Sequence, residues 1–129
     1  MNQKNLIVFV CEHGAAKSIL AATYFNKLAK ESNLNLHAIA RGTNPDQELS
    51  PTTIEGLRQD GMTPTESTAQ KLMPADLESA ERIIAFCDLP EEYQNTIPIE
   101  HWNNIPPVSE NYEKARDVIV EHIHRLLNN

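Results

Sequence analysis

Cysteine is rare in this sequence. Only Cys11 and Cys87 occur among the 129 residues, which is too few for a zinc-binding framework, so we expect no metal and no other cofactor. Nothing at the N-terminus resembles a signal peptide, because the apolar run at residues 6–10 is short and no cleavage site follows it. We therefore expect a cytoplasmic protein whose thiols are reduced at rest, which disfavours a structural disulfide.

Basic residues and long apolar runs are also scarce. The chain has 11 Lys and Arg against 18 Asp and Glu, for a net charge of −7. This balance argues against nucleic acid as a partner, because binding a phosphate backbone needs a basic surface. A small anionic ligand remains possible, since salt limits the reach of distant charges to about 8 Å. No stretch approaches the roughly 20 apolar residues of a membrane-spanning helix, so we expect no membrane partner.

The sequence alternates between strand-like and helix-like segments. Short apolar runs predict strands at residues 6–10, 36–40, 82–86 and 99–102, and a loop is expected at 90–98. Amphipathic spacing predicts helices at residues 17–30, 51–58 and from 74–77, and a last helix with one face formed by Tyr112, Ala115, Ile119, Ile123 and Leu126. Ser50 before Pro51 is typical of a helix start, and Gly61 of a helix end. The alternation indicates one α/β domain over residues 1–129, with a parallel sheet covered by helices on both faces.

Both cysteines directly follow a predicted strand. Ligands of such sheets bind beyond the carboxyl ends of the strands, so Cys11 and Cys87 should lie at that edge. Cys11 also begins the loop that leads into the first predicted helix. The sequence from this cysteine to the first turn of the helix is Cys11-Glu12-His13-Gly14-Ala15-Ala16-Lys17-Ser18.

This loop has the features of an anion-binding site. A loop that enters a helix N-terminus directs unpaired backbone N–H groups at one place, and the helix dipole adds about half a positive charge there. Gly14 can adopt the positive φ that such a curl usually needs, and the small Ala15 and Ala16 let the backbone close around an anion. The expected oxyanion-binding residues are Glu12, His13, Gly14, Ala15, Ala16 and Lys17.

The same surroundings favour Cys11 as a nucleophile. A thiol at a helix N-terminus near a lysine ionises more readily than a free thiol, and a thiolate behind an oxyanion attacks it. Ser18 is placed to donate a hydrogen bond to the sulfur. A lone cysteine at a strand end is more often a buried, inert residue. The Gly-Ala-Ala loop and the following Lys17-Ser18 favour the catalytic interpretation.

The loop resembles that of the low-molecular-weight protein tyrosine phosphatases and of the arsenate reductases that share their fold. Their loop is Cys, five residues, Arg and Ser; here Cys11 and five residues precede Lys17 and Ser18. The likeness covers nearly the whole chain and continues in Ala40-Arg41-Gly42-Thr43, Gly61, Ala69-Gln70-Lys71-Leu72, His101-Trp102 and Lys114-Ala115-Arg116-Asp117. It implies a flavodoxin-like three-layer sandwich with a four-stranded parallel sheet, and hydrolysis of a phosphate monoester through a thiophosphate on Cys11.

Two features depart from the phosphatase pattern. Lys17 stands where the family has Arg, and it offers one compact charge in place of a planar fork. The family's general acid is an Asp before a Pro, but residues 103–107 read Asn-Asn-Ile-Pro-Pro and hold no carboxylate. A positioned acid is typically worth about 10²- to 10⁴-fold in rate. Whether Asp88, Glu110 or Glu12 reaches the leaving group is left open by the sequence.

The second cysteine keeps a redox alternative open. Cys87 matches the second of three relay cysteines in thioredoxin-coupled arsenate reductases, and no third cysteine follows it. In a two-cysteine cycle Cys11 attacks arsenate, Cys87 resolves the adduct as a disulfide, and thioredoxin or a small thiol restores both. A packing role for Cys87 at a strand end is an equal alternative.

Three functions therefore remain at the level of the sequence. The first is a phosphatase-like enzyme acting on a small oxyanion or phosphoester, with Cys11, Lys17 and Ser18 as catalytic residues. The second is an arsenate reductase in which Cys87 joins them. The third is a catalytically impaired phosphate-binding protein.

Overall fold

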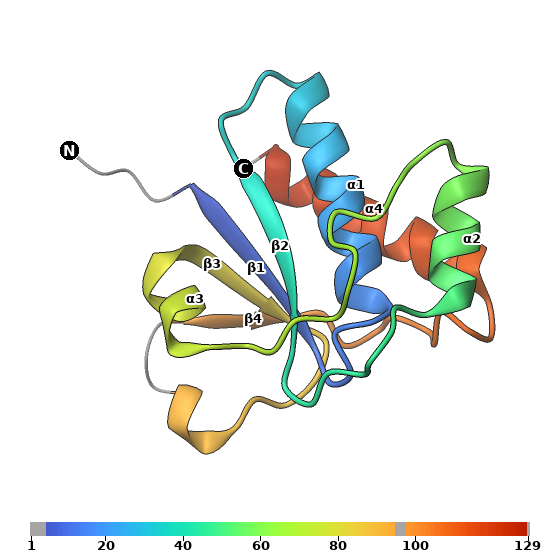
Figure 1. Cartoon of the computed structure of the whole chain (residues 1–129). Coiled ribbons are helices and arrows are strands. Elements are labelled where there is room, and N and C mark those ends of the chain that lie inside the picture. The colour runs from blue at the N-terminus through green and yellow to red at the C-terminus, as the bar shows by residue number, and fades with distance from the viewer. Residues whose placement is uncertain (1–4, 95–97, 129) are drawn as a thin grey trace.

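The computed structural model describes residues 5–94 and 98–128, and within these ranges four strands alternate with helices along the chain (Figure 1). The strands are β1 (Leu6–Cys11), β2 (His37–Gly42), β3 (Ala80–Ala85) and β4 (Ile99–His101). The α-helices are α1 (Lys17–Glu31), α2 (Pro51–Gln59), α3 (Pro74–Ser79) and α4 (Tyr112–Leu127), and a 3₁₀ helix, η1, covers Glu91–Tyr93.

All neighbouring strands are parallel, and their order across the sheet is β2-β1-β3-β4. This order places β1 at the centre and makes the chain cross over through helices. The predicted α/β fold of flavodoxin-like type is therefore confirmed. The carboxyl ends of the strands converge on one edge, at the lower centre of Figure 1, where the loops that follow β1, β2 and β3 lie together.

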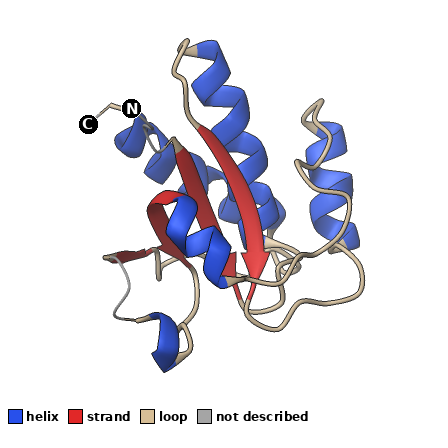
Figure 2. Ribbon diagram, turned by 60° about the vertical axis from the view of Figure 1, so that its left-hand side comes forward, coloured by secondary structure: helices blue, strands red, loops and turns tan. Residues whose placement is uncertain are grey.

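Helices cover both faces of the sheet, so the molecule has three layers (Figure 2). Alternate residues of β1 divide between the layers, as the pleat of a strand requires. Ile7 and Phe9 pack in the core beneath α1 and α4, whereas Val8 and Val10 pack in the core beneath α3. Because both faces are buried, β1 is a continuous apolar run.

The predicted helix signals are present. The Oγ of Ser50 accepts a hydrogen bond from the backbone N–H of Thr53, which caps α2. Gly61 follows the end of α2 with φ +81°, the left-handed conformation that favours glycine. Asn111 caps α4 in the same way as Ser50 caps α2, by accepting from the N–H of Lys114.

Some boundaries differ from the predictions. β2 extends to Gly42, because it pairs with β1 as far as Cys11. β3 begins at Ala80 and ends before Phe86. The expected loop at residues 90–98 contains the η1 turn, and its residues 95–97 lie outside the described part of the chain.

The outer edge of β2 is bonded to partners from other segments. The side chain of Asn26 bonds both the N–H and the carbonyl of Ala38. The N–H of Ala40 donates to Glu66, and its carbonyl accepts from the Arg41 guanidinium. Gly42 donates to the carbonyl of Gln70 and accepts from the N–H of Leu72. The segment 66–72 thus closes this edge of the sheet.

Asp60 joins three helices at the end of α2. Its carboxylate accepts hydrogen bonds from the Tyr24 hydroxyl of α1 at 2.6 Å and from the Tyr112 hydroxyl of α4 at 2.8 Å. Arg116 pairs with the same carboxylate at 3.1 Å. Burial alone raises the pKa of Asp60, but these donors outweigh it and hold that pKa below its ordinary value.

Candidate functional site

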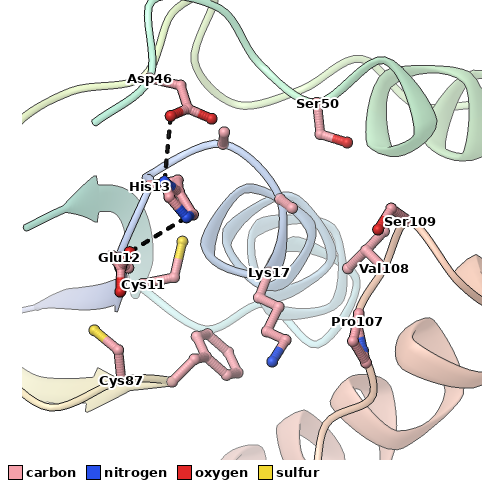
Figure 3. Close-up of a pocket in the computed structure, with 13 residues that line it drawn as sticks. Cys11, Glu12, His13, Lys17, Asp46, Ser50, Cys87, Pro107, Val108 and Ser109 are labelled. Carbon is pink, nitrogen blue, oxygen red and sulfur yellow. Dashed lines mark ion pairs between the residues drawn. The ribbon is translucent and has the colours of Figure 1, made fainter. Parts of the chain in front are cut away.

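A pocket of about 440 Å³ opens at the carboxyl edge of the sheet, where both cysteines were expected (Figure 3). Its walls come from the loop after β1, the loop before α2, the end of β3 and the segment before α4. The lining residues are Cys11, Glu12, His13, Ala15, Ala16, Lys17, Asp46, Ser50, Phe86, Cys87, Pro107, Val108 and Ser109.

Cys11 lies at the floor of this pocket. It ends β1 and is only 8% exposed. Its Sγ is 2.9 Å from the Oγ of Ser18, which is fully buried in the first turn of α1. The predicted contact between Ser18 and the sulfur is therefore present. This contact holds the sulfur in place at the end of β1.

The loop above Cys11 turns its carbonyl groups away from the pocket. The carbonyls of Cys11, Glu12, His13 and Ala15 accept hydrogen bonds from backbone N–H groups of segment 43–50, at 2.6 to 3.1 Å. In a planar trans peptide the N–H points opposite to the C=O. The N–H groups that follow these four carbonyls therefore point away from segment 43–50. Backbone amides that point to one side of a loop are the kind of donors from which an anion-binding nest is built.

Two glycines give the loop its shape. Gly14 has φ +88°, as the sequence predicted for the curl. Gly42 lies directly against it, at the end of β2. A Cβ on Gly42 would come within 2.5 Å of the Gly14 backbone nitrogen. The loop therefore depends on a contact between residues far apart in the sequence.

The N-terminus of α1 faces the same space. Its N-cap is Ala16, which makes no side-chain capping bond. The first amides of a helix lack intrahelical partners, and the helix dipole adds partial positive charge at this end. Lys17 begins the helix and lines the pocket, but in Figure 3 its ammonium points away from the Cys11 sulfur.

Cys87 lies on the wall next to Cys11 (Figure 3), so the structure brings the two predicted cysteines into one pocket. Burial and, to a smaller extent, the neighbouring Cys11 raise the pKa of the Cys87 thiol to about 11, although a hydrogen bond with Thr43 opposes the shift. Cys87 is thus a protonated thiol at neutral pH.

His13 lies between two carboxylates at the rim. Its Nε2 is 3.3 Å from Glu12 and its Nδ1 is 3.2 Å from Asp46. Sequence reasoning placed Glu12 and His13 at the site but missed Asp46, because this residue comes from the loop after β2. The backbone of Asp46 reaches the loop through its N–H bond to the carbonyl of His13, a contact with no local sequence signal.

The opposite rim carries no carboxylate among the residues that the structure places there. Segment 107–109 contributes Pro107, Val108 and Ser109 to the pocket. Asp88 and Glu110 are exposed and do not line it. Of the three carboxylates that the sequence left open, Glu12 alone is at the pocket within residues 5–94 and 98–128.

The described residues hold neither a cluster of metal ligands nor a membrane-spanning helix. No group of three or more His, Cys, Asp or Glu side chains is arranged to hold a metal ion there. No helix in the same part of the chain is long and apolar enough to cross a membrane.

Solved structures with the same fold include phosphatases and arsenate reductases. The chain superposes on YfkJ from Bacillus subtilis with a TM-score of 0.84 and 21% identity, over 98% of this chain and 94% of that one. For a low molecular weight protein tyrosine phosphatase from T. tengcongensis the TM-score is 0.77 and the identity 21%, over 95% and 97%. For an arsenate reductase from Archaeoglobus fulgidus the TM-score is 0.73 and the identity 21%, over 95% and 99%.

At this level of identity the superpositions establish the fold. The sequence comparison goes further, because residues 6–122 match one family along almost the whole chain, including the loop at Cys11 and the helix α4. The chain therefore belongs to the low molecular weight phosphotyrosine protein phosphatase family.

Proposed function

We propose that this protein is a phosphatase-like enzyme in which the Cys11 thiolate attacks the phosphorus of a phosphate monoester. The observation that carries the proposal is the position of the Cys11 sulfur, 2.9 Å from the buried Ser18 hydroxyl and in the same pocket as the loop whose carbonyls bond to segment 43–50. Family membership supports chemistry of the phosphatase or arsenate reductase type. The choice of ester hydrolysis is our own inference from this site.

The oxyanion-binding residues expected from the sequence, together with Ser18, each have a role in this proposal, whereas Cys87 has none. Backbone amides from Glu12 to Ala16 hold the non-bridging oxygens, and such dipoles are effective because the fold fixes them before the reaction. Ser18 holds the sulfur as a thiolate. Lys17 supplies one positive charge to the oxygens, after its flexible side chain turns toward the anion.

The reaction proceeds in two displacements. In the first, a lone pair of the Cys11 sulfur forms the S–P bond while the P–O bond to the leaving group breaks, and the leaving oxygen takes a proton. In the second, water attacks the phosphorus of the thiophosphate, the S–P bond breaks, and inorganic phosphate and the thiolate are released.

Arsenate reduction is the second candidate, and the position of Cys87 in the same pocket as Cys11 favours it. Cys11 displaces hydroxide from arsenate, and the protonated Cys87 loses its proton as its sulfur attacks that of Cys11. The disulfide forms, two electrons pass to arsenic, and arsenite leaves. Thioredoxin or a small thiol then reduces the disulfide.

A parallel assay separates these functions. Aryl phosphate hydrolysis and thiol-dependent arsenate reduction are measured for the wild type, for Cys11→Ser and for Cys87→Ser. Hydrolysis that requires Cys11 and survives in Cys87→Ser supports the proposal. Arsenate reduction that requires both cysteines, without hydrolysis, replaces it with the second candidate. Phosphate binding without either activity identifies an impaired phosphate-binding protein.

A further inference from the structure

The rim of the pocket holds three ionisable side chains in direct contact, Glu12, His13 and Asp46. Each nitrogen of the His13 ring has its own carboxylate, at 3.3 Å for Glu12 and 3.2 Å for Asp46. The three side chains are 61%, 59% and 54% exposed, respectively. They come from two loops that the backbone bond between Asp46 and His13 joins. The His13 ring therefore lies between two carboxylates at the solvent-exposed rim.

The proposed hydrolysis needs a proton donor that the opposite rim does not supply. An alkoxide or phenoxide leaves slowly unless its oxygen is protonated as the P–O bond breaks. Pro107, Val108 and Ser109 line that rim, and none of them is an acid near neutral pH. The ionisable groups that line the pocket in the described chain are Cys11, Glu12, His13, Lys17, Asp46 and Cys87.

Most of these groups are engaged or chemically unsuited. Cys11 is the nucleophile, and Lys17 serves the non-bridging oxygens. The pKa of the Cys87 thiol is raised to about 11, so this thiol is a weak proton donor at neutral pH. Imidazole is the side chain whose ordinary charge change falls between about pH 5 and 8, which suits both donation and return of a proton.

The location of His13 fits the direction of the reaction. In a phosphoryl transfer the leaving oxygen lies in line with the nucleophile, on the far side of the phosphorus. The sulfur of Cys11 is at the floor, with Cys11 only 8% exposed, so the leaving group points to the mouth of the pocket. His13 lies at that mouth.

We propose that His13 is the proton donor to the leaving oxygen, and that Glu12 and Asp46 are positioning residues that orient its ring. This inference rests on the proposed hydrolysis. In the phosphatase pattern the general acid belongs to the segment before α4. In this protein the proton donor would lie at the rim formed by the loops after β1 and β2.

The proton balance closes over both displacements. In the first, an N–H of the protonated imidazole gives its proton to the leaving oxygen, the P–O electrons stay on that oxygen, and an alcohol or phenol departs. In the second, the neutral imidazole takes a proton from the attacking water as its oxygen bonds to phosphorus. The S–P electrons return to Cys11, and His13 is protonated again.

The test compares two esters that differ in their need for an acid. Phenyl phosphate has a poor leaving group, whereas p-nitrophenyl phosphate has a good one. For His13→Asn we expect kcat/KM to fall about 10²- to 10⁴-fold with phenyl phosphate and far less with p-nitrophenyl phosphate. Asparagine keeps an N–H donor for a neighbouring carboxylate but cannot release a proton. A merely structural effect lowers both rates by the same factor and overturns the proposal.

Two further variants control the comparison. Glu110→Gln and Asp88→Asn remove carboxylates outside the pocket and should leave both rates unchanged; a selective loss of phenyl phosphate hydrolysis in either variant makes that residue the acid instead.

The positioning role of Asp46 has its own test. Asp46→Asn should lose phenyl phosphate hydrolysis selectively, and the double variant with His13→Asn should lose no more than His13→Asn alone. Additive losses contradict the positioning role.

The same experiment separates failure of this inference from failure of the proposed function. If the wild type hydrolyses neither ester above the level of Cys11→Ser, the hydrolase proposal falls and the proton donor falls with it. If hydrolysis depends on Cys11 but His13→Asn shows no leaving-group selectivity, the inference about His13 alone is wrong.

Discussion

Gly42 lies so close to Gly14 that a Cβ on Gly42 would be 2.5 Å from the Gly14 nitrogen and 2.8 Å from its Cα. The two glycines come from the end of β2 and from the loop after β1, and each has a distinct task. Gly14 provides the positive φ of the curl, whereas Gly42 leaves the room for it. The shape of the loop after β1 therefore depends on Gly42 of β2 as well as on its own Gly14.

We expect Gly42→Ala to weaken phosphate binding at least tenfold and to destabilise the protein by about 1–3 kcal/mol, because a methyl group here must push the loop backbone aside. Phosphate titration calorimetry and urea unfolding measure the two effects. Gly61→Ala is the matched control: its positive φ makes alanine unfavourable, but nothing lies near the added Cβ. It should lose stability and keep phosphate affinity. Equal affinity in both variants contradicts the role of Gly42.

Lys17→Arg should raise kcat/KM for aryl phosphates by about ten- to a hundredfold. A planar guanidinium contacts two phosphate oxygens at once, and one additional charge-assisted hydrogen bond is worth about 1.5–3 kcal/mol. Lys27→Arg, on the exposed side of the same helix, should change nothing. An unchanged or lower rate in Lys17→Arg would mean that the loop has adapted to lysine.

The two thiols should differ in their reaction with iodoacetamide. The pKa of Cys87 is raised to about 11 by burial and then by Cys11, so Cys87 should resist alkylation at neutral pH and react only as the pH approaches that value. Its protonated form is favoured in the folded state. The burial of the protonated Cys87 thiol thus contributes fully to stability at a pH below the ordinary thiol pKa of 9.0. This contribution is lost as the pH rises toward the raised pKa of about 11. Mass spectrometry of the alkylated peptides from pH 7 to 11 gives the result, and rapid labelling of Cys87 at pH 7 contradicts it.

Asp60→Asn should destabilise the protein by about 1–3 kcal/mol, since the variant weakens hydrogen bonds that join α1 and α4 to the end of α2. Because the pKa of Asp60 is lowered in the folded protein, the Asp60 carboxylate contributes fully to stability at a pH above its ordinary pKa of 3.8. This contribution is lost as the pH falls through the lowered pKa. The stability difference from the wild type, measured by urea unfolding, should therefore shrink in strong acid. Glu55→Gln removes an exposed pairing with Arg58 and should leave the stability almost unchanged. A difference between Asp60→Asn and the wild type that stays constant down to pH 2 contradicts this account.

Much of the fold was predictable because its signals are local. The apolar run of β1, the capping Ser50 before Pro51 and the spacing of α4 each lie within a few consecutive residues. The loop at Cys11 was predictable for the same reason: nucleophile, glycine, helix start and Ser18 are contiguous in sequence. The expected contact of Ser18 with the sulfur needs only one turn of helix.

The parts that sequence reasoning missed depend on contacts between distant segments. Asp46 reaches His13 across 33 positions only because β1 and β2 pair with Cys11 opposite Gly42. The bond from Ala40 to Glu66 and the joining of Tyr24 and Tyr112 at Asp60 have no periodic pattern to reveal them. The rim at residues 107–109, which carries no carboxylate, could likewise not be predicted. It forms because the fold places the segment before α4 beside the loop after β1.

The bonded outer edge of β2 has a consequence for the behaviour of the protein at high concentration. A strand from another molecule joins a sheet where backbone donors and acceptors stand free. At Ala38, Ala40 and Gly42 these groups are already occupied by Asn26, Glu66, Arg41 and segment 70–72. Edge-to-edge association with another molecule is thereby disfavoured along β2, because no free backbone group remains at these three residues to start it.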